Sequence, residues 1–157
     1  MGREVLLRPE RCILCLACEV ACAREHGSQE RIWVIHHNGH GAPVSCRQCQ
    51  TAPCVAVCPP QALEQRNGSV VLVAEKCTGC ELCLWACPFG AMVLDTERGQ
   101  AYKCDLCSSR QEEGLEPACV LTCPSQALVL NCVADFAARR RDVAGRAWAA
   151  GWTRRGR

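Results

Sequence analysis

The chain has 157 residues with a formal net charge of +2; 17 residues are cysteine, and only 4% are aromatic. So few aromatic residues give a thin conventional core, while the cysteine content far exceeds that of ordinary globular proteins. A secreted disulfide scaffold is disfavoured, because the cysteine number is odd and the N-terminal segment lacks an apolar signal region. We therefore expect a cytoplasmic protein. The most apolar run, residues 70–74, has the length of a strand, which argues against a membrane span.

Sixteen cysteines form four groups along the chain, and each group opens with C-x2-C and closes with C-x3-C. The middle gap has two residues in the first and third groups, four in the second and eleven in the fourth. The groups are Cys12, Cys15, Cys18, Cys22; Cys46, Cys49, Cys54, Cys58; Cys77, Cys80, Cys83, Cys87; and Cys104, Cys107, Cys119, Cys123. In bacterial ferredoxins this spacing places three thiolates on one 4Fe-4S cluster and the fourth on its neighbour.

Proline follows the last cysteine of three groups, at Pro59, Pro88 and Pro124. The segments CPPQAL, CPFGAM and CPSQAL thus form an internal repeat. We expect these cysteines to begin helices, because proline fits the first turn of a helix. Zinc is the competing metal, but structural zinc needs two cysteine pairs per ion and fits the triplets of the first and third groups poorly.

Short strand patterns alternate with the cysteine loops. The predicted strands and hairpins cover residues 5–8, 32–35, 62–73, 92–103 and 127–130. Asn67-Gly68 is a strong signal for a hairpin turn, and Gly99 marks a second one. Short strands and short helices predict an α+β fold with two ferredoxin-like halves, in which metal binding replaces the missing hydrophobic burial.

The composition changes after Cys132. Residues 133–157 contain seven arginines and two aspartates, a local charge of +5, whereas the rest of the chain carries −3. Apolar residues recur at helical intervals and predict an amphipathic helix: Val133, Phe136, Ala137, Val143, Ala144, Ala147, Trp148 and Trp152.

Large aromatic rings beside arginines are typical of interface anchors. We therefore expect residues 133–157 to dock a partner subunit or a second copy of this chain, head to tail, rather than to be a solvated end. Nucleic-acid binding is disfavoured, because the acidic body repels phosphates.

The order of the groups and the phrases PVSCRQCQTAPCVAVCP, CTGCELCLWACPFGAM and YKCDLC resemble four-cluster ferredoxin-like electron-transfer subunits of molybdenum and tungsten pterin oxidoreductases. Similar subunits serve hydrogenases and carbon monoxide dehydrogenases. The resemblance covers roughly residues 4–131 and implies four 4Fe-4S clusters. It implies a four-cluster domain over residues 1–132 and crossed ligand sets: Cys12, Cys15, Cys18, Cys123; Cys104, Cys107, Cys119, Cys22; Cys46, Cys49, Cys54, Cys87; and Cys77, Cys80, Cys83, Cys58.

Three other features have simpler interpretations. His36, His37 and His40 are expected in a solvated loop that contains Gly39 rather than in a metal site. Cys132, outside every group, is interpreted as an inert, partly buried thiol. Trp85, between two cysteines, is expected to shield a cluster from water.

The sequence contains no nucleotide-binding loop, no hydrolase motif and no nucleophile–base arrangement. We therefore expect that this protein has no catalytic residues and no enzyme activity of its own. Its expected role is electron transfer between a catalytic oxidoreductase and a second redox module, such as a flavin subunit. A tungsten or molybdenum pterin aldehyde oxidoreductase or formate dehydrogenase is the favoured partner by resemblance. The alternatives are a freely diffusing polyferredoxin and an adaptor of a hydrogenase or carbon monoxide dehydrogenase.

Overall fold

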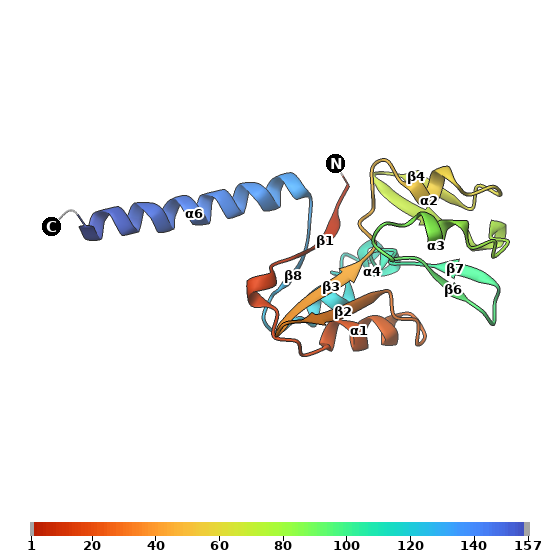
Figure 1. Ribbon diagram of the computed structural model, residues 1–157, viewed down its shortest axis with the longest axis horizontal. Coiled ribbons are helices and arrows are strands. Elements are labelled where there is room, and N and C mark those ends of the chain that lie inside the picture. The colour runs from red at the N-terminus through yellow and green to blue at the C-terminus, as the bar shows by residue number, and fades with distance from the viewer. Residues whose placement is uncertain (1, 156–157) are drawn as a thin grey trace.

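The computed structural model describes residues 2–155, with side chains through residue 151. Short strands and short helices form a mixed body, from which one long helix extends (Figure 1). The predicted fold class, with ferredoxin-like halves and a C-terminal helix, is confirmed. The strands are β1 (Glu4–Leu7), β2 (Ile32–His37), β3 (His40–Ser45), β4 (Leu63–Arg66), β5 (Ser69–Leu72), β6 (Val93–Asp95), β7 (Gln100–Tyr102) and β8 (Leu128–Asn131); the α-helices are α1 (Ala17–Glu25), α2 (Pro53–Ala56), α3 (Leu82–Ala86), α4 (Ser108–Glu112), α5 (Ala118–Leu121) and α6 (Val133–Arg155).

The strands pair as four antiparallel ribbons, and three of these are local hairpins. The β4–β5 and β6–β7 hairpins lie where the sequence predicts them, with Asn67 and Gly68 at the first turn. The fourth ribbon joins β1 to β8, so that Glu4 lies opposite Asn131. This non-local pairing brings the first and fourth cysteine groups into the same half of the molecule.

Two apolar clusters form the core, and both are rich in cysteine. The first packs β1, α1 and β8 around Ile32 and Leu128, whose exposed fractions are 2% and 3%. The second packs Leu63, Val70 and Met92 from the β4–β5 and β6–β7 half. Cys46 of the second group belongs to the first cluster, which places it at the junction of the halves.

The expected helices after the fourth cysteines are absent. Instead α2, α3 and α5 end just before Cys58, Cys87 and Cys123, so that each proline follows a helix rather than beginning one. Proline has no N–H to continue a helical hydrogen-bond ladder, which favours the stop. The third residue after each of these cysteines has a positive φ, namely 51° at Gln61, 60° at Gly90 and 53° at Gln126. The internal repeat is therefore a helix–cysteine–proline turn.

The histidine segment is a hairpin end rather than a loop. His36 and His37 continue β2, and His37 lies opposite His40 across the turn at Asn38 and Gly39. All three side chains are exposed, as the solvated interpretation expects. Extending the predicted strand by two residues lets these backbone groups pair with β3.

Helix α6 leaves the body after Cys132 and points away from it (Figure 1). Its first turns contact the body: the guanidinium groups of Arg8 and Arg140 each lie 5.9 Å from the centroid of the Phe136 ring. Farther along, the Trp148 side chain is 82% exposed. The predicted anchor Trp152 lies on α6, but its side chain is outside the described residues.

Candidate metal centres

Each C-x2-C loop has a left-handed residue directly before its second cysteine. The φ angle is 59° at Leu14, 47° at Gln48, 67° at Gly79 and 61° at Leu106. Such a backbone turns successive N–H groups toward the inside of the loop and creates a concavity that binds anions, including iron-sulfur centres. Three of these residues are not glycine, so their left-handed conformation has a steric cost. The surrounding fold holds them in this conformation despite that cost.

The thiols of one candidate centre line a single cavity at the β4–β7 end of the molecule. The cavity is lined by Cys77, Cys80 and Cys83 of the third group together with Cys58 of the second. Its wall is otherwise largely apolar and includes Leu63, Leu72 and Ala101. Burial, with smaller contributions from the neighbouring thiolates including those of Cys77 and Cys58, raises the pKa of Cys83 to about 11.

The second candidate centre combines Cys46, Cys49 and Cys54 with Cys87 of the third group. Burial raises the pKa of both Cys49 and Cys54, and the charges of Cys46 and Cys87 raise it further in each case. Cys54 lies in the second apolar cluster, and Cys49 and Cys87 pack against that cluster. The backbone N–H of Ala91 donates to Cys87 Sγ at 3.4 Å.

The third candidate centre lies in the other half of the body. Burial raises the pKa of Cys119 far above its usual range, and the charges of Cys104, Cys107 and Cys22 add to the shift. The pKa of Cys22 is likewise raised by burial and by the charge of Cys107. Cys22 of the first group packs in the same apolar cluster as Cys104 and Cys119 of the fourth.

The fourth candidate centre lies beside β1 and β8. Burial, with a contribution from the Cys123 thiolate, raises the pKa of Cys18 to about 11. The N–H of Ala127 donates to Cys123 Sγ at 3.2 Å. Gly41 of β3 lets the first loop approach closely, because a Cβ on this residue would lie 2.7 Å from Cys12 Sγ.

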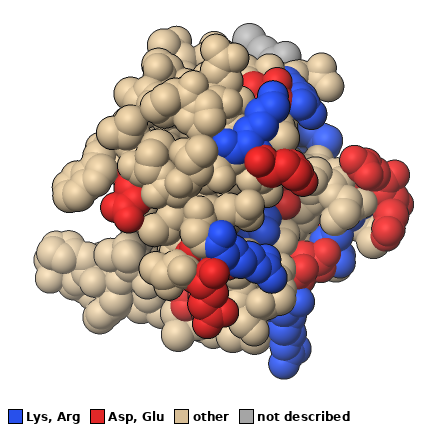
Figure 2. All heavy atoms as spheres, turned by 90° about the vertical axis from the view of Figure 1, so that its right-hand side faces the viewer, with Lys and Arg blue, Asp and Glu red and all other residues tan. Residues whose placement is uncertain are grey.

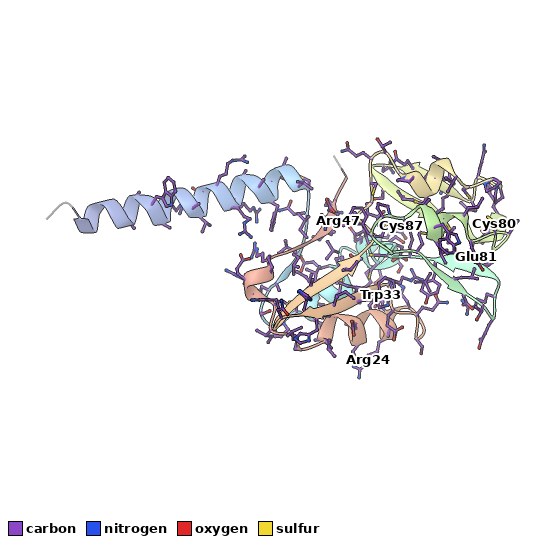
Figure 3. All side chains as sticks on the ribbon, viewed as in Figure 1. Arg24, Trp33, Arg47, Cys80, Glu81 and Cys87 are labelled. Atoms are coloured by element: carbon purple, nitrogen blue, oxygen red, sulfur yellow. The ribbon has the colours of Figure 1, made fainter. Side chains whose placement is uncertain are left out.

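The four candidate centres span both halves of the body. Cys18, Cys46, Cys104 and Cys119 pack in the first apolar cluster, and Cys54 and Cys83 pack in the second, so the centre of Cys46 and Cys54 joins the two halves. Cys15 and Cys80 are exposed, whereas the other grouped cysteines are buried or half-buried. Figure 3 shows Cys80 at the end of the body and Cys87 nearer its middle. The two exposed thiols thus belong to centres in different halves of the body.

These thiols fit 4Fe-4S clusters. All 17 cysteines are free thiols, and none forms a disulfide. Packed thiols whose negative charges repel one another favour a bound cation that neutralises them, and thiolates are the usual ligands of iron-sulfur clusters. The structure thus brings residues of each crossed set together, while the full assignment of sixteen ligands stays a prediction.

Sequence reasoning missed several polar residues near the thiols. His26 Nε2 lies 3.6 Å from Cys107 Sγ and 3.6 Å from Asp105 Oδ1, and Arg31 donates a 2.8 Å hydrogen bond to the other carboxylate oxygen, Asp105 Oδ2. The backbone N–H of Arg31 donates to Cys22 Sγ at 3.3 Å. Lys103 is buried beside Cys104. Of these residues only Lys103 could have been noticed in the sequence, since both lysines of the chain, Lys76 and Lys103, directly precede the first cysteine of a group.

Trp85 does not shield a centre, contrary to the expectation, because its side chain is 86% exposed. It lies on α3 in a segment, residues 82–94, that like residues 48–63 contains no Asp, Glu, Lys or Arg, although exposed Glu81 is the N-cap residue of α3. In Figure 2, which shows this end of the molecule, most charged side chains gather on one side, and the other side is largely uncharged apart from an acidic side chain. Cys132 is partly buried, as expected, and its sulfur accepts a hydrogen bond from the N–H of Asp135 at 3.5 Å.

Comparisons with known proteins agree with this chemistry. The protein-family description "4Fe-4S dicluster domain" matches residues 38–133. The putative electron transport protein YsaA of Escherichia coli K12 is 40% identical over 142 residues, covering 82% of this chain and 88% of the relative. Electron transport protein HydN of the same strain is 35% identical, with 82% and 87% coverage. The putative oxidoreductase AegA, also of that strain, is 37% identical, but the match covers 83% of this chain and only 22% of AegA.

Proposed function

This chain belongs to the family of 4Fe-4S dicluster proteins and is an iron-sulfur electron-transfer protein, and we propose that it relays single electrons through four clusters between a catalytic oxidoreductase and a second redox module. The observation that supports this most strongly is that thiols of the four groups gather in both halves of the body, with one exposed cysteine in each half, Cys15 and Cys80. Each 4Fe-4S cluster supplies a site that gains and loses one electron.

The proposed ligand sets are the crossed ones. They are Cys12, Cys15, Cys18, Cys123; Cys104, Cys107, Cys119, Cys22; Cys46, Cys49, Cys54, Cys87; and Cys77, Cys80, Cys83, Cys58. The charge interactions of Cys18, Cys22 and Cys54 support this pairing, since each involves a thiol of the set to which the residue is assigned. Cys58 supports it as well, because it lines the same cavity as Cys77, Cys80 and Cys83.

The polypeptide contributes position and insulation. The left-handed residues of the C-x2-C loops aim backbone N–H groups inward, and Ala91 and Ala127 add N–H donors to the thiols of the fourth cysteines. The apolar cores keep water away from the central thiols. In this role the chain needs no catalytic residues, because the partner's cofactor carries out the chemistry on the substrate.

An oxidoreductase partner is supported by AegA, in which a segment similar to this chain is part of a longer protein named as a putative oxidoreductase. We favour a tungsten or molybdenum pterin enzyme of the aldehyde oxidoreductase or formate dehydrogenase type, ahead of a hydrogenase or carbon monoxide dehydrogenase. The exposed apolar side chains of Leu82, Trp85 and Phe89, in the same cysteine segment as exposed Cys80, support a lasting apolar contact rather than a weak electrostatic one.

Residues 133–157 are proposed to be a docking segment for that complex or for a second copy of the chain. The exposed Trp148 and Val143 support this role, because large apolar side chains in water favour burial against a partner. A second copy would receive the basic helix on its acidic, cluster-bearing body and extend the series of centres head to tail. None of the helices described is long and apolar enough to cross a membrane.

The test is anaerobic purification of the protein from its native host. We expect about sixteen iron and sixteen sulfide atoms per chain, broad visible absorption, reducible clusters by electron paramagnetic resonance (EPR), and co-purification with an oxidoreductase subunit. A colourless zinc protein would contradict the cluster assignment. An iron-loaded protein that elutes as a free monomer from fresh extract would instead favour the diffusing polyferredoxin.

A further inference from the structure

Lys103 is a buried cation at the junction of the two halves. The residue is 3% exposed and lies between the end of β7 and Cys104. Its Nζ donates hydrogen bonds to the carbonyl oxygens of Val70 and Cys104. No ion pair between described side chains involves Lys103, although several join arginines to carboxylates. A buried ammonium group without an opposite charge is strongly destabilising, so its counter-charge must come from elsewhere.

The two carbonyl groups that bind Lys103 belong to different halves of the body. Val70 packs with Cys54 of the second group in one apolar cluster, whereas Cys104 of the fourth group packs in the other. The ammonium group therefore lies between segments that carry thiols of two different centres. Gln48 completes the junction, because its amide donates to the Cys104 carbonyl at 2.9 Å and accepts from the Val70 N–H.

We propose that Lys103 is the shared counter-cation of the two central clusters and raises the reduction potentials of both. This inference rests on the proposed function, in which Cys54 and Cys104 are ligands of those two clusters. Reduction adds one negative charge to a cluster, and a fixed positive charge nearby stabilises the reduced form more than the oxidised form. The effect is strong in a buried setting, where little water screens the charge. Lys103 is thus a positioning residue that keeps the middle of the series accessible to electrons.

A purely structural role makes a different prediction. If Lys103 only joined the Val70 and Cys104 carbonyls, a neutral hydrogen-bond donor of similar length would replace it. Lys103→Gln keeps a donor and removes the charge, whereas Lys103→Arg keeps the charge. Lys76→Gln is a matched control, because Lys76 directly precedes Cys77 as Lys103 precedes Cys104, but its side chain is exposed.

The experiment is a redox titration of the iron-loaded full-length proteins, followed by EPR with iron analysis of each variant. We expect Lys103→Gln to shift two of the four midpoint potentials to more negative values, Lys103→Arg to restore them toward wild type, and Lys76→Gln to leave all four in place. Unchanged potentials in iron-loaded Lys103→Gln would overturn the inference and leave the proposed function intact.

If Lys103→Gln fails to hold iron, the Lys103→Arg variant distinguishes a role of the charge from a role of the side-chain shape. Full iron content in Lys103→Arg would support the need for a positive charge at this position. Iron loss in both variants would overturn the inference and favour a steric role. Wild-type protein without reducible clusters would refute the proposed function itself.

Discussion

The body and helix α6 are held together by different means. In the body the longest helix, α1, has 9 residues and the strands have at most 6. Helix α6 has 23 residues, and most of its side chains are exposed. The body depends on ligands that converge from distant parts of the chain, whereas α6 depends on its own backbone. The two regions should therefore respond independently to metal removal, ligand loss and truncation.

Iron removal should have the largest effect. Chelation under reducing conditions is expected to unfold the body, because its apolar core is too small to offset the chain entropy. Far-UV circular dichroism should show this loss, with a residual helical signal from α6. A variant truncated after residue 132 lacks α6 and should not show that residual signal after iron removal. A cooperative thermal transition in the iron-free protein would contradict the dependence of the body on metal.

Loss of one crossed ligand should damage a centre in a distant group. Cys22→Ser is expected to impair the cluster assigned to Cys104, Cys107 and Cys119 more than the one assigned to Cys12, Cys15 and Cys18. EPR and iron analysis measure the loss. Cys132→Ser is the control, since this thiol lies outside every group, and it should retain full iron. Loss confined to the cluster of the first loop would show that the pairing is not crossed.

Truncation tests the other region. Deleting residues 133–157 should leave all four clusters intact and abolish assemblies larger than one copy of the chain. Size-exclusion chromatography with iron analysis separates the two effects. Trp148→Ala should weaken the same assembly while leaving α6 in place. If the truncated protein still elutes in the high-mass complex, the segment is only a solvated end.

The smallest expected effect concerns the joint between the regions. Phe136→Ala removes the ring that lies beside the guanidinium groups of Arg8 and Arg140. It should destabilise the attachment of α6 by about 1 kcal/mol, seen as faster hydrogen exchange in the first turns of the helix. Val143→Ala, at an exposed position farther along α6, is the control and should leave exchange in those turns unchanged.

Local signals made much of the fold predictable. Asn67-Gly68 predicts the β4–β5 hairpin because its preference for a tight turn depends only on those residues. Pairing of β1 with β8 has no such signal, since it joins residues far apart in sequence. The helix expected after Cys58 was wrong, because proline suits both the start of a helix and the turn that follows one.

The candidate centres were predictable in kind but not in their surroundings. Cysteine spacing indicates iron-sulfur ligation, because it reflects which thiols share a loop. The burial of Lys103 and the exposure of Trp85 depend on how the two halves pack, and neither follows from spacing. Apolar character alone suggested a shielding role for Trp85, which its position on the outer side of α3 does not allow.

The β1–β8 ribbon has a consequence for the order in which the protein matures. The two proposed sets drawn from the second and third groups end at Cys83 and Cys87, so both are complete when little more than half of the chain has been synthesised. The sets that join the first and fourth groups wait for Cys119 and Cys123, and β1 has no partner until β8 emerges. During synthesis, therefore, the β4–β7 half can receive iron first, while the N-terminal segment stays unpaired until translation is nearly finished.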